Sequence, residues 1–296
     1  MCGIVGLLLK TPALNERLGM LVTPMLVSMA ERGPDSAGLA VFADRDRGEK
    51  YSLFAEDAHF DWDALERALD EALVPTPRIE PQGRYARLYL DVDPDTLRRW
   101  MAEHFPQLHV LSAGHFMDIY KDAGHPAEIA ERYDFPALTG SHAVGHTRMA
   151  TESAITPAHA HPFTAGEDFC LVHNGSLSNP YKIRRKLERK GIRFETDNDT
   201  EAACRFLEWR LREGDGLEDA LSEGFSVLDG FYTLLMATRD ELALVRDSFA
   251  CKPAVVAETD DYVAIGSEYR ALAHLPGVKA ASLFEPRPEE IYTWRR

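Results

Sequence analysis

The chain opens with an apolar segment, residues 2–9, that few structural environments can accommodate. A short segment without polar interruption is typical of a strand that is covered on both faces. No basic residues precede the segment and Lys10 follows it at once, so it does not have the form of a signal peptide. We therefore expect a buried strand within a layered fold.

Helical and strand patterns then alternate along the chain. Between Asn15 and Arg32 the apolar residues recur at spacings of three and four, which predicts a helix that is kinked at Pro24 and ended by Gly33-Pro34. Further predicted strands are 39–42, 143–149, 170–173, 232–237, 242–246, 254–257, 262–265 and 281–284, and further predicted helices are 180–190, 200–212, 217–228 and 269–274. Many strands with helices between them indicate a mixed layered fold.

Residues 44–140 have a different pattern. Helices are predicted at 61–73 and 94–105, and strands at 84–92, 108–111 and 116–120. Pro75, Pro77 and Pro81 predict a hinge after the first of these helices. We expect this segment to form a small α/β insertion.

Charge narrows the classes of partner. Lys and Arg number 33 against 48 Asp and Glu, a formal net charge of −15, which disfavours nucleic-acid binding. We find no apolar run near the ~18 residues that span a bilayer, and four cysteines are too few for a disulfide framework. We expect a cytoplasmic protein without a membrane contact. The basic run 182–190 predicts a solvated helix face, with an anion or partner site as the alternative.

Cys2 lies between Met1 and Gly3. Removal of Met1 would give Cys2 a free α-amine, whose pKa of ~7.7–8.0 allows it to act as a general base beside the thiol. An incidental small residue at this position is the alternative.

Other motifs follow Met-Cys-Gly-Ile in a definite order. They are Glu31-Arg32-Gly33-Pro34-Asp35-Ser36, Gly145-His146-Thr147-Arg148, Ala160-His161-Pro162-Phe163, Val172-His173-Asn174-Gly175, Asp197-Asn198-Asp199-Thr200-Glu201, Lys252-Pro253 and Gly266-Ser267-Glu268. This ordered set resembles the class II glutamine amidotransferases, which are N-terminal-nucleophile hydrolases. The resemblance covers residues 2–42 and 141–284. It implies an α+β fold, a four-layer α/β/β/α sandwich over residues 2–296, with the inserted α/β segment at about 44–140.

The resemblance also implies the catalytic roles. Cys2 would attack the side-chain amide of L-glutamine, and Asn174 and Gly175 would form the oxyanion hole. Arg148 would bind the α-carboxylate of the substrate, because a guanidinium pairs with a carboxylate through two hydrogen bonds. Asp199 would bind the α-ammonium. Without the resemblance, Asn174-Gly175 is more typical of a turn and Arg148 of a surface side chain. Asp199 is also typical of a helix N-cap, a role that is compatible with binding the α-ammonium.

Arg32, Gly33 and Thr151 would complete the glutamine-binding region by the same resemblance. Glu152 departs from the His or Asn that several branches of the family carry, which puts the contacts of that loop in question. A metal site built from His142 with His146, or His159 with His161, is an alternative use of the histidines, but we expect no metal and no cofactor in this chain.

Members of this family usually carry a second domain that consumes the ammonia, and this chain ends soon after the last motif. We therefore expect a hetero-oligomer with an ammonia-accepting synthase subunit, most like the separate amidotransferase subunit of complexes of the glutamate-synthase and N-methylglutamate-synthase kind. FMN, where such a complex uses it, would belong to the partner. A stand-alone amidohydrolase acting on another amide and a non-catalytic regulatory subunit are the alternatives.

Overall fold

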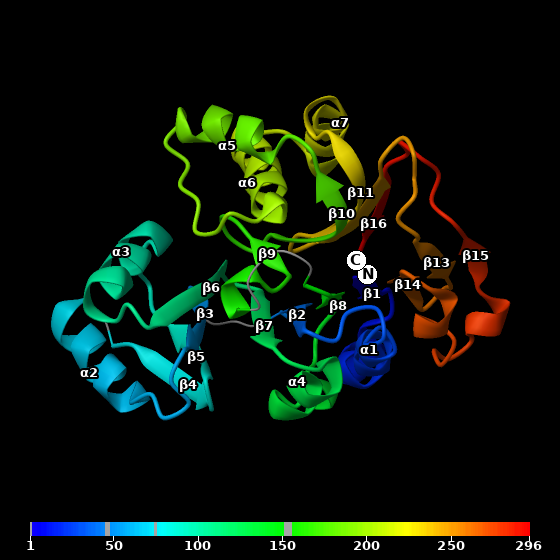
Figure 1. Ribbon diagram of the computed structural model, residues 1–296. Coiled ribbons are helices and arrows are strands. Elements are labelled where there is room, and N and C mark those ends of the chain that lie inside the picture. Colours follow the sequence, from blue (N-terminus) through cyan, green and yellow to red (C-terminus); the bar gives the residue numbers. More distant parts are fainter. Residues whose placement is uncertain (1, 45–47, 74–75, 151–155) are drawn as a thin grey trace.

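A computed structural model describes residues 2–44, 48–73, 76–150 and 156–296 of the protein (Figure 1). The described residues form three β-sheets. Within these ranges the sheets contain seven, five and four strands, and every pairing between neighbouring strands is antiparallel. The two larger sheets build the body that carries the candidate site.

The seven-stranded sheet contains the N-terminal strand near its centre. Its order is β15 (Ser282–Phe284), β13 (Val255–Glu258), β14 (Tyr262–Gly266), β1 (Gly3–Leu9), β8 (His142–Arg148), β2 (Ser36–Phe42) and β7 (Met117–Ala123). Along β1, Val5 and Leu7 pack toward the helices, whereas Ile4 and Leu8 pack toward the second sheet. Both faces are covered, which explains why the segment is apolar throughout.

The five-stranded sheet packs face to face with the first. Its order is β16 (Tyr292–Arg295), β12 (Glu241–Arg246), β11 (Gly230–Ala237), β10 (Cys170–Leu177) and β9 (Phe163–Thr164). Val172 and Leu235 of this sheet share a buried cluster with Ile4 and Leu8 of β1. This interdigitated apolar layer holds the two sheets together.

Helices cover the outer faces of both sheets (Figure 1). On the first sheet lie α1 (Leu18–Val27) and α4 (Pro126–Arg132); on the second lie α5 (Pro180–Glu188), α6 (Asp199–Arg212) and α7 (Leu217–Val227). The four layers confirm the expected α/β/β/α sandwich. Pro24 lies inside α1, but the helix begins later than predicted, because residues Pro12–Arg17 form a 3₁₀ turn.

The third sheet forms the expected α/β insertion. Its order is β4 (Arg78–Gln82), β5 (Tyr85–Tyr89), β3 (Lys50–Ala55) and β6 (Leu108–Gly114), and its apolar cluster includes residues of α2 (Trp62–Ala72) and α3 (Pro94–His104). The insertion covers less of the chain than the predicted residues 44–140. The strand β7 lies within that range but pairs with β2 along its full length, so it belongs to the main sheet. Pro81, predicted in a hinge, lies in the edge strand β4, where a missing N–H interrupts no ladder.

Buried charges join the insertion to the main sheet. Lys50 of β3 lies with its Nζ 3.0 Å from Oδ1 of Asp118 on β7, and both side chains are almost fully buried. Arg87 of β5 places its Nε 3.3 Å from the other oxygen of Asp118. At the turn between β6 and β7, the Asp168 carboxylate accepts the backbone N–H groups of residues 115–117, each at 2.9 Å. These contacts hold the insertion to the main sheet.

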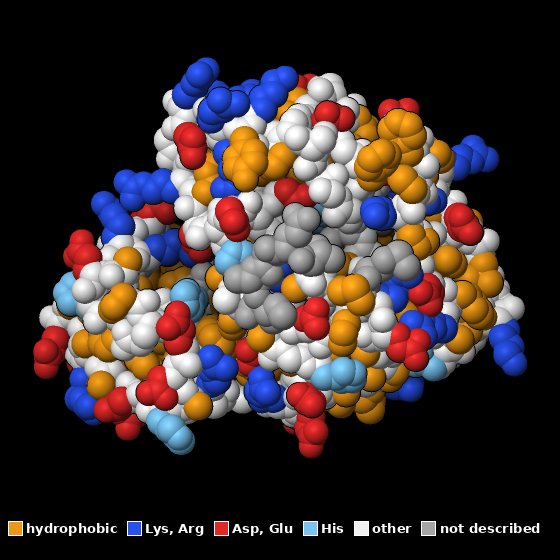
Figure 2. All heavy atoms as spheres, viewed as in Figure 1, with side chains coloured by type: hydrophobic (Ala, Val, Ile, Leu, Met, Phe, Trp, Pro, Cys, Tyr) orange, Lys and Arg blue, Asp and Glu red, His pale blue; other side chains and the backbone are white. Residues whose placement is uncertain are grey.

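The basic run lies mainly on the outer face of α5. Figure 2 shows Lys and Arg side chains gathered over this helix, where Lys182, Arg185, Lys186 and Arg189 are exposed. The exposure agrees with the predicted solvated helix face. No helix in the described part of the chain is long and apolar enough to cross a bilayer.

Candidate active site

Cys2 precedes β1, and the pairing of β1 with β8 fixes what lies beside it. Gly3, the first residue of β1, pairs with Thr147, and Arg148 is the next and last residue of β8. The thiol is free and the residue is partly exposed. Its backbone carbonyl accepts hydrogen bonds from Nε of Arg32 at 2.9 Å and from Nδ2 of Asn174 at 3.1 Å. Side chains from the first loop and the second sheet therefore meet at Cys2.

Asn174 and Gly175 lie within a strand. In β10 they pair with Thr233 and Tyr232 of β11, so the interpretation of Asn-Gly as a turn is wrong. The strand is longer than the predicted 170–173 and carries both residues to the Cys2 end of the sandwich. Gly175 has φ of 140°, and a Cβ there would lie 1.8 Å from the carbonyl oxygen of Phe231. Only glycine fits this position without displacing the neighbouring backbone.

Arg148 is the last residue of β8 and is only 5% exposed, so it is not the surface side chain of the alternative interpretation. Its carbonyl accepts the N–H of Asp35 at 3.1 Å. Gly33 packs closely against the same end of β8. A Cβ at this position would lie only 2.4 Å from the carbonyl carbon of Thr147. The Arg32-Gly33 loop is thereby packed beside Arg148. Residues 151 and 152, which include the predicted Thr151, lie outside the described residues.

Asp199 is the first residue of α6. The N-cap is Asn198, whose side chain accepts the N–H of Thr200 at 2.8 Å, so the N-cap interpretation of Asp199 is wrong. Oδ2 of Asp199 accepts the N–H of Leu177 at 2.8 Å, and its Oδ1 lies 3.8 Å from Nδ1 of His173. A carboxylate in the first turn of a helix is favoured by the helix dipole.

A buried histidine cluster behind these residues was not predicted as a unit. The rings of His146 and His161 stack with centroids 4.1 Å apart. Thr200 Oγ1 lies 2.9 Å from Nε2 of His161 and 3.0 Å from Nδ1 of His173, and Nε2 of His146 lies 3.1 Å from the carbonyl oxygen of His173. Burial lowers the pKa of His146 to about 3, and it also lowers the pKa values of His161 and His173. The sequence signal for this cluster was the histidine in each of three separate motifs.

The histidine pairs considered for a metal do not converge. His142 and His146 are four residues apart on one strand, a separation of ~13 Å at the usual rise. His142 stacks on Phe42 and places its Nε2 2.8 Å from the carbonyl oxygen of Thr238, whereas His159 lies beside Asp197. The described residues contain no group of three or more His, Cys, Asp or Glu that could hold a metal ion.

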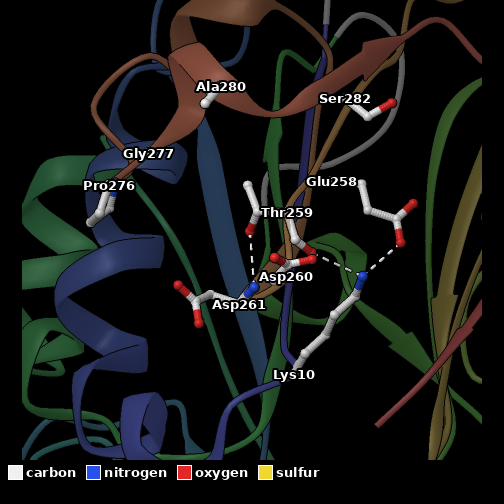
Figure 3. Close-up of a pocket in the computed structure, with 9 residues that line it drawn as sticks. All are labelled: Lys10, Glu258, Thr259, Asp260, Asp261, Pro276, Gly277, Ala280 and Ser282. Carbon is white, nitrogen blue, oxygen red and sulfur yellow. Dashed lines mark hydrogen bonds and ion pairs between the residues drawn. The ribbon is translucent and has the colours of Figure 1, made fainter.

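A cavity of about 500 Å³ lies at the opposite end of β1 (Figure 3). Lys10 lines it and pairs with Oε1 of Glu258 at 2.6 Å and with the carbonyl oxygen of Thr259 at 3.0 Å. The length of β1 separates this cavity from Cys2 by ~20 Å. None of the predicted site residues lines it.

The buried histidines predict a loss of stability in mild acid. Their pKa values in the folded state lie below the ~6.5 of an unfolded histidine, so below pH ~6.5 the unfolded chain binds more protons. We expect the free energy of unfolding to be fully maintained above pH ~6.5 and to fall by up to ~1.4 kcal/mol per pH unit for each histidine below it.

Urea unfolding at a series of pH values between 7.5 and 5 measures this slope. His161→Gln removes one titrating group and should make the slope shallower, whereas the same change at the exposed His104 should leave it unaltered. Equal slopes in wild type and the His161 variant would contradict the assignment.

Comparison with known proteins identifies the family. A family model described as a glutamine amidotransferase domain matches residues 146–274. The chain is 46% identical to the glutamine amidotransferase-like protein GlxB of Rhizobium meliloti (strain 1021) over 296 residues, which cover 99% of this chain and 98% of the relative.

Solved structures agree in fold. A structure described as the allosteric regulatory enzyme of purine biosynthesis matches 99% of this chain with a TM-score of 0.64 at 20% identity. The glutamine phosphoribosylpyrophosphate amidotransferase of B. subtilis matches 99% with a TM-score of 0.62 at 19% identity. The chain spans about half the length of each, 47% and 49%, and at these identities the likeness shows the fold. By its full-length similarity to GlxB, its matching domain and its fold, the chain belongs to the class II glutamine amidotransferases, enzymes of the N-terminal-nucleophile type.

Proposed function

We propose that Cys2 hydrolyses the side-chain amide of L-glutamine and that the ammonia passes to a synthase subunit on another chain. The observation that carries the first part is the meeting of Arg32 and Asn174 on the carbonyl of Cys2, at 2.9 and 3.1 Å. These contacts fix the main chain of Cys2 while leaving its thiol free. A fixed nucleophile beside an amide donor is the arrangement that acyl transfer requires.

The reaction begins with transfer of the thiol proton to the α-amine that removal of Met1 would expose. The thiolate adds to the amide carbon of glutamine, and the oxygen of that carbon becomes an oxyanion. The side-chain N–H of Asn174 and the backbone N–H of Gly175 stabilise this charge. The C–N bond then breaks, the α-ammonium returns its proton to the leaving nitrogen, and ammonia departs. Water hydrolyses the resulting γ-glutamyl thioester to glutamate and restores the thiol.

Recognition of a free amino acid needs one cation and one anion near the nucleophile. Arg148, buried at the end of β8 and one residue beyond the partner of Gly3, supplies a guanidinium for the α-carboxylate. Asp199, held by the N–H of Leu177, supplies a carboxylate for the α-ammonium. Arg32 and Gly33 position the Cys2 end of β1 against Arg148 and take no part in the bond changes. These chain residues complete the chemistry without a cofactor.

The partner proposal is supported by two exposed aromatic side chains close to β10, the strand that carries Asn174 and Gly175. Phe231 and Phe249 are 47% and 70% exposed, and their ring centroids lie 5.2 Å apart. The carbonyl of Phe231 lies against Gly175. Adjacent exposed aromatic rings are typical of protein interfaces. We propose that an ammonia-accepting synthase subunit of the glutamate-synthase kind, with any FMN on that subunit, covers this aromatic pair.

Replacement of the nucleophile tests the reaction. Cys2→Ser should bind glutamine yet lose most glutamate formation, because a hydroxyl is a poorer nucleophile near neutral pH. The measurements are glutamate release and the intact mass after incubation with an electrophilic glutamine analogue, which should add once, at Cys2. Cys251→Ser alters an exposed free cysteine and should change neither result. A Cys2→Ser rate within a few-fold of wild type would exclude Cys2 as the nucleophile.

Replacement of the carboxylate-binding residue tests recognition. Arg148→Lys keeps the charge but loses the two-pronged hydrogen bonding, so KM for glutamine should rise by ~10-fold or more while kcat changes little. Steady-state kinetics measure both constants. The control is Arg239→Lys, a change at an exposed arginine that should leave KM unaltered. An unchanged KM in the Arg148 variant would remove this residue from the carboxylate site.

Purification tests the partner. The native chain should co-purify with a second polypeptide, and Phe249→Ser should weaken that association while labelling of Cys2 by the analogue persists. Tyr181→Ser, at a tyrosine on α5 that is 69% exposed, is the matched control. A native chain that purifies alone and turns over glutamine would overturn the partner proposal and leave the hydrolysis intact.

A further inference from the structure

Ser267 lies directly after β14 and joins this strand to the start of β1. It is 2% exposed. Its N–H donates to the carbonyl of Ile4 at 3.0 Å, and its Oγ accepts the N–H of Ile4 at 2.9 Å. The Ser267 hydroxyl thus accepts the N–H of Ile4 in place of a main-chain carbonyl. Ile4 is two residues from Cys2, the proposed nucleophile.

The same hydroxyl oxygen also reaches the second sheet. Oγ of Ser267 accepts a hydrogen bond from Nδ2 of Asn174 at 3.0 Å. One buried oxygen therefore receives an N–H from β1 of the first sheet and an N–H from β10 of the second. This contact fixes the amide of Asn174 relative to the strand that carries Cys2.

The next residue holds Cys2 from the other side. Oε1 of Glu268 pairs with Nη1 of Arg32 at 2.6 Å, and its Oε2 lies 2.8 Å from Nε of Arg270. Arg32 in turn donates to the carbonyl of Cys2. Two consecutive residues, Ser267 and Glu268, thus orient Asn174 and Arg32, which both donate to the Cys2 carbonyl.

Both N–H groups of Asn174 are engaged in the structure, one with Oγ of Ser267 and one with the carbonyl of Cys2. A primary amide is planar, so holding one N–H fixes the direction of the other. The carbonyl of Cys2 also accepts a hydrogen bond from Arg32. The second N–H of Asn174 can therefore be shared with an oxyanion, without rotation of the amide and without leaving that carbonyl unpaired.

We propose that Ser267 is a positioning residue for the hydrolysis: its hydroxyl fixes the amide plane of Asn174 so that the N–H shared with the Cys2 carbonyl is aimed at the developing oxyanion. This inference rests on the proposed function, because it assigns a source of order to the same oxyanion hole. Glu268 fixes Arg32, the donor that stays on the Cys2 carbonyl.

The test is a double-mutant cycle between Ser267 and Asn174. Ser267→Ala should lower kcat by about 10- to 100-fold, the effect of a small misplacement of a reacting group, with KM for glutamine unchanged. Asn174→Ala should lower kcat by ~10²–10³-fold. The double variant should be no slower than Asn174→Ala alone, because the hydroxyl acts through the amide. Ser267→Thr retains a hydroxyl and should recover most of kcat.

Controls separate catalysis from folding. Ser226→Ala makes the same chemical change at an exposed serine of α7, which donates to the carbonyl of Glu223, and should leave kcat and the melting temperature unaltered. Melting temperatures of all variants show whether Ser267 has a purely structural role, in which it joins two strands without positioning Asn174 for catalysis. In that case Ser267→Ala would lower the melting temperature and leave kcat of the folded protein intact, which would overturn the proposal.

Multiplicative effects in the double variant would overturn the proposal as well, because they would show that Ser267 acts independently of Asn174. Failure of the proposed function has a different signature: Cys2→Ser would retain hydrolysis. A slow Ser267→Ala variant with normal KM, together with no added loss in the double variant, supports the positioning role.

Discussion

The burial of β1 on both faces is the constraint on which the site depends. Val5 and Leu7 pack under the helices and Ile4 and Leu8 pack against the second sheet, so the strand can neither slip nor rotate without exposing one apolar set. A one-residue slip relative to β8 would reverse every side chain. The start of the chain is thereby held at one edge of the inter-sheet core, and Cys2 reaches the same place as the end of β8.

The second sheet brings the side-chain amide of Asn174 to Cys2. In the proposed reaction the nucleophile needs hydrogen-bond donors, and Asn174 of β10 can be one of them because β10 packs against the sheet that carries β1 and its amide reaches Cys2. The close approach of Gly175 to the carbonyl of Phe231 shows how tightly this position is packed. Within the sandwich, Ser267 and the pair formed by Arg32 and Glu268 tie the nucleophile strand to its surroundings. The order of the site is therefore a property of two sheets and the segments that connect them.

The insertion is attached by polar contacts as well as by packing. Charges as deeply buried as Lys50 and Asp118 are costly unless they are paired. Such a contact specifies one arrangement of the third sheet against β7. The insertion therefore has one defined orientation relative to the body of the enzyme.

The sequence by itself determined the layered fold class and the buried first strand, because periodicity is a local property, and the order of its motifs predicted the chemistry at Cys2. It also indicated Asn174, Arg148 and Asp199, through the resemblance and without any distance between them. It did not determine that Asn174 and Gly175 lie inside a strand, since an Asn-Gly pair is compatible with a turn until β11 pairs with it. Only the tertiary structure placed β7 in the main sheet and joined three histidines through Thr200. Only it put the hydroxyl of Ser267 between two sheets, because contacts between residues 93 positions apart depend on how the sheets pack and leave no periodic signal in the chain.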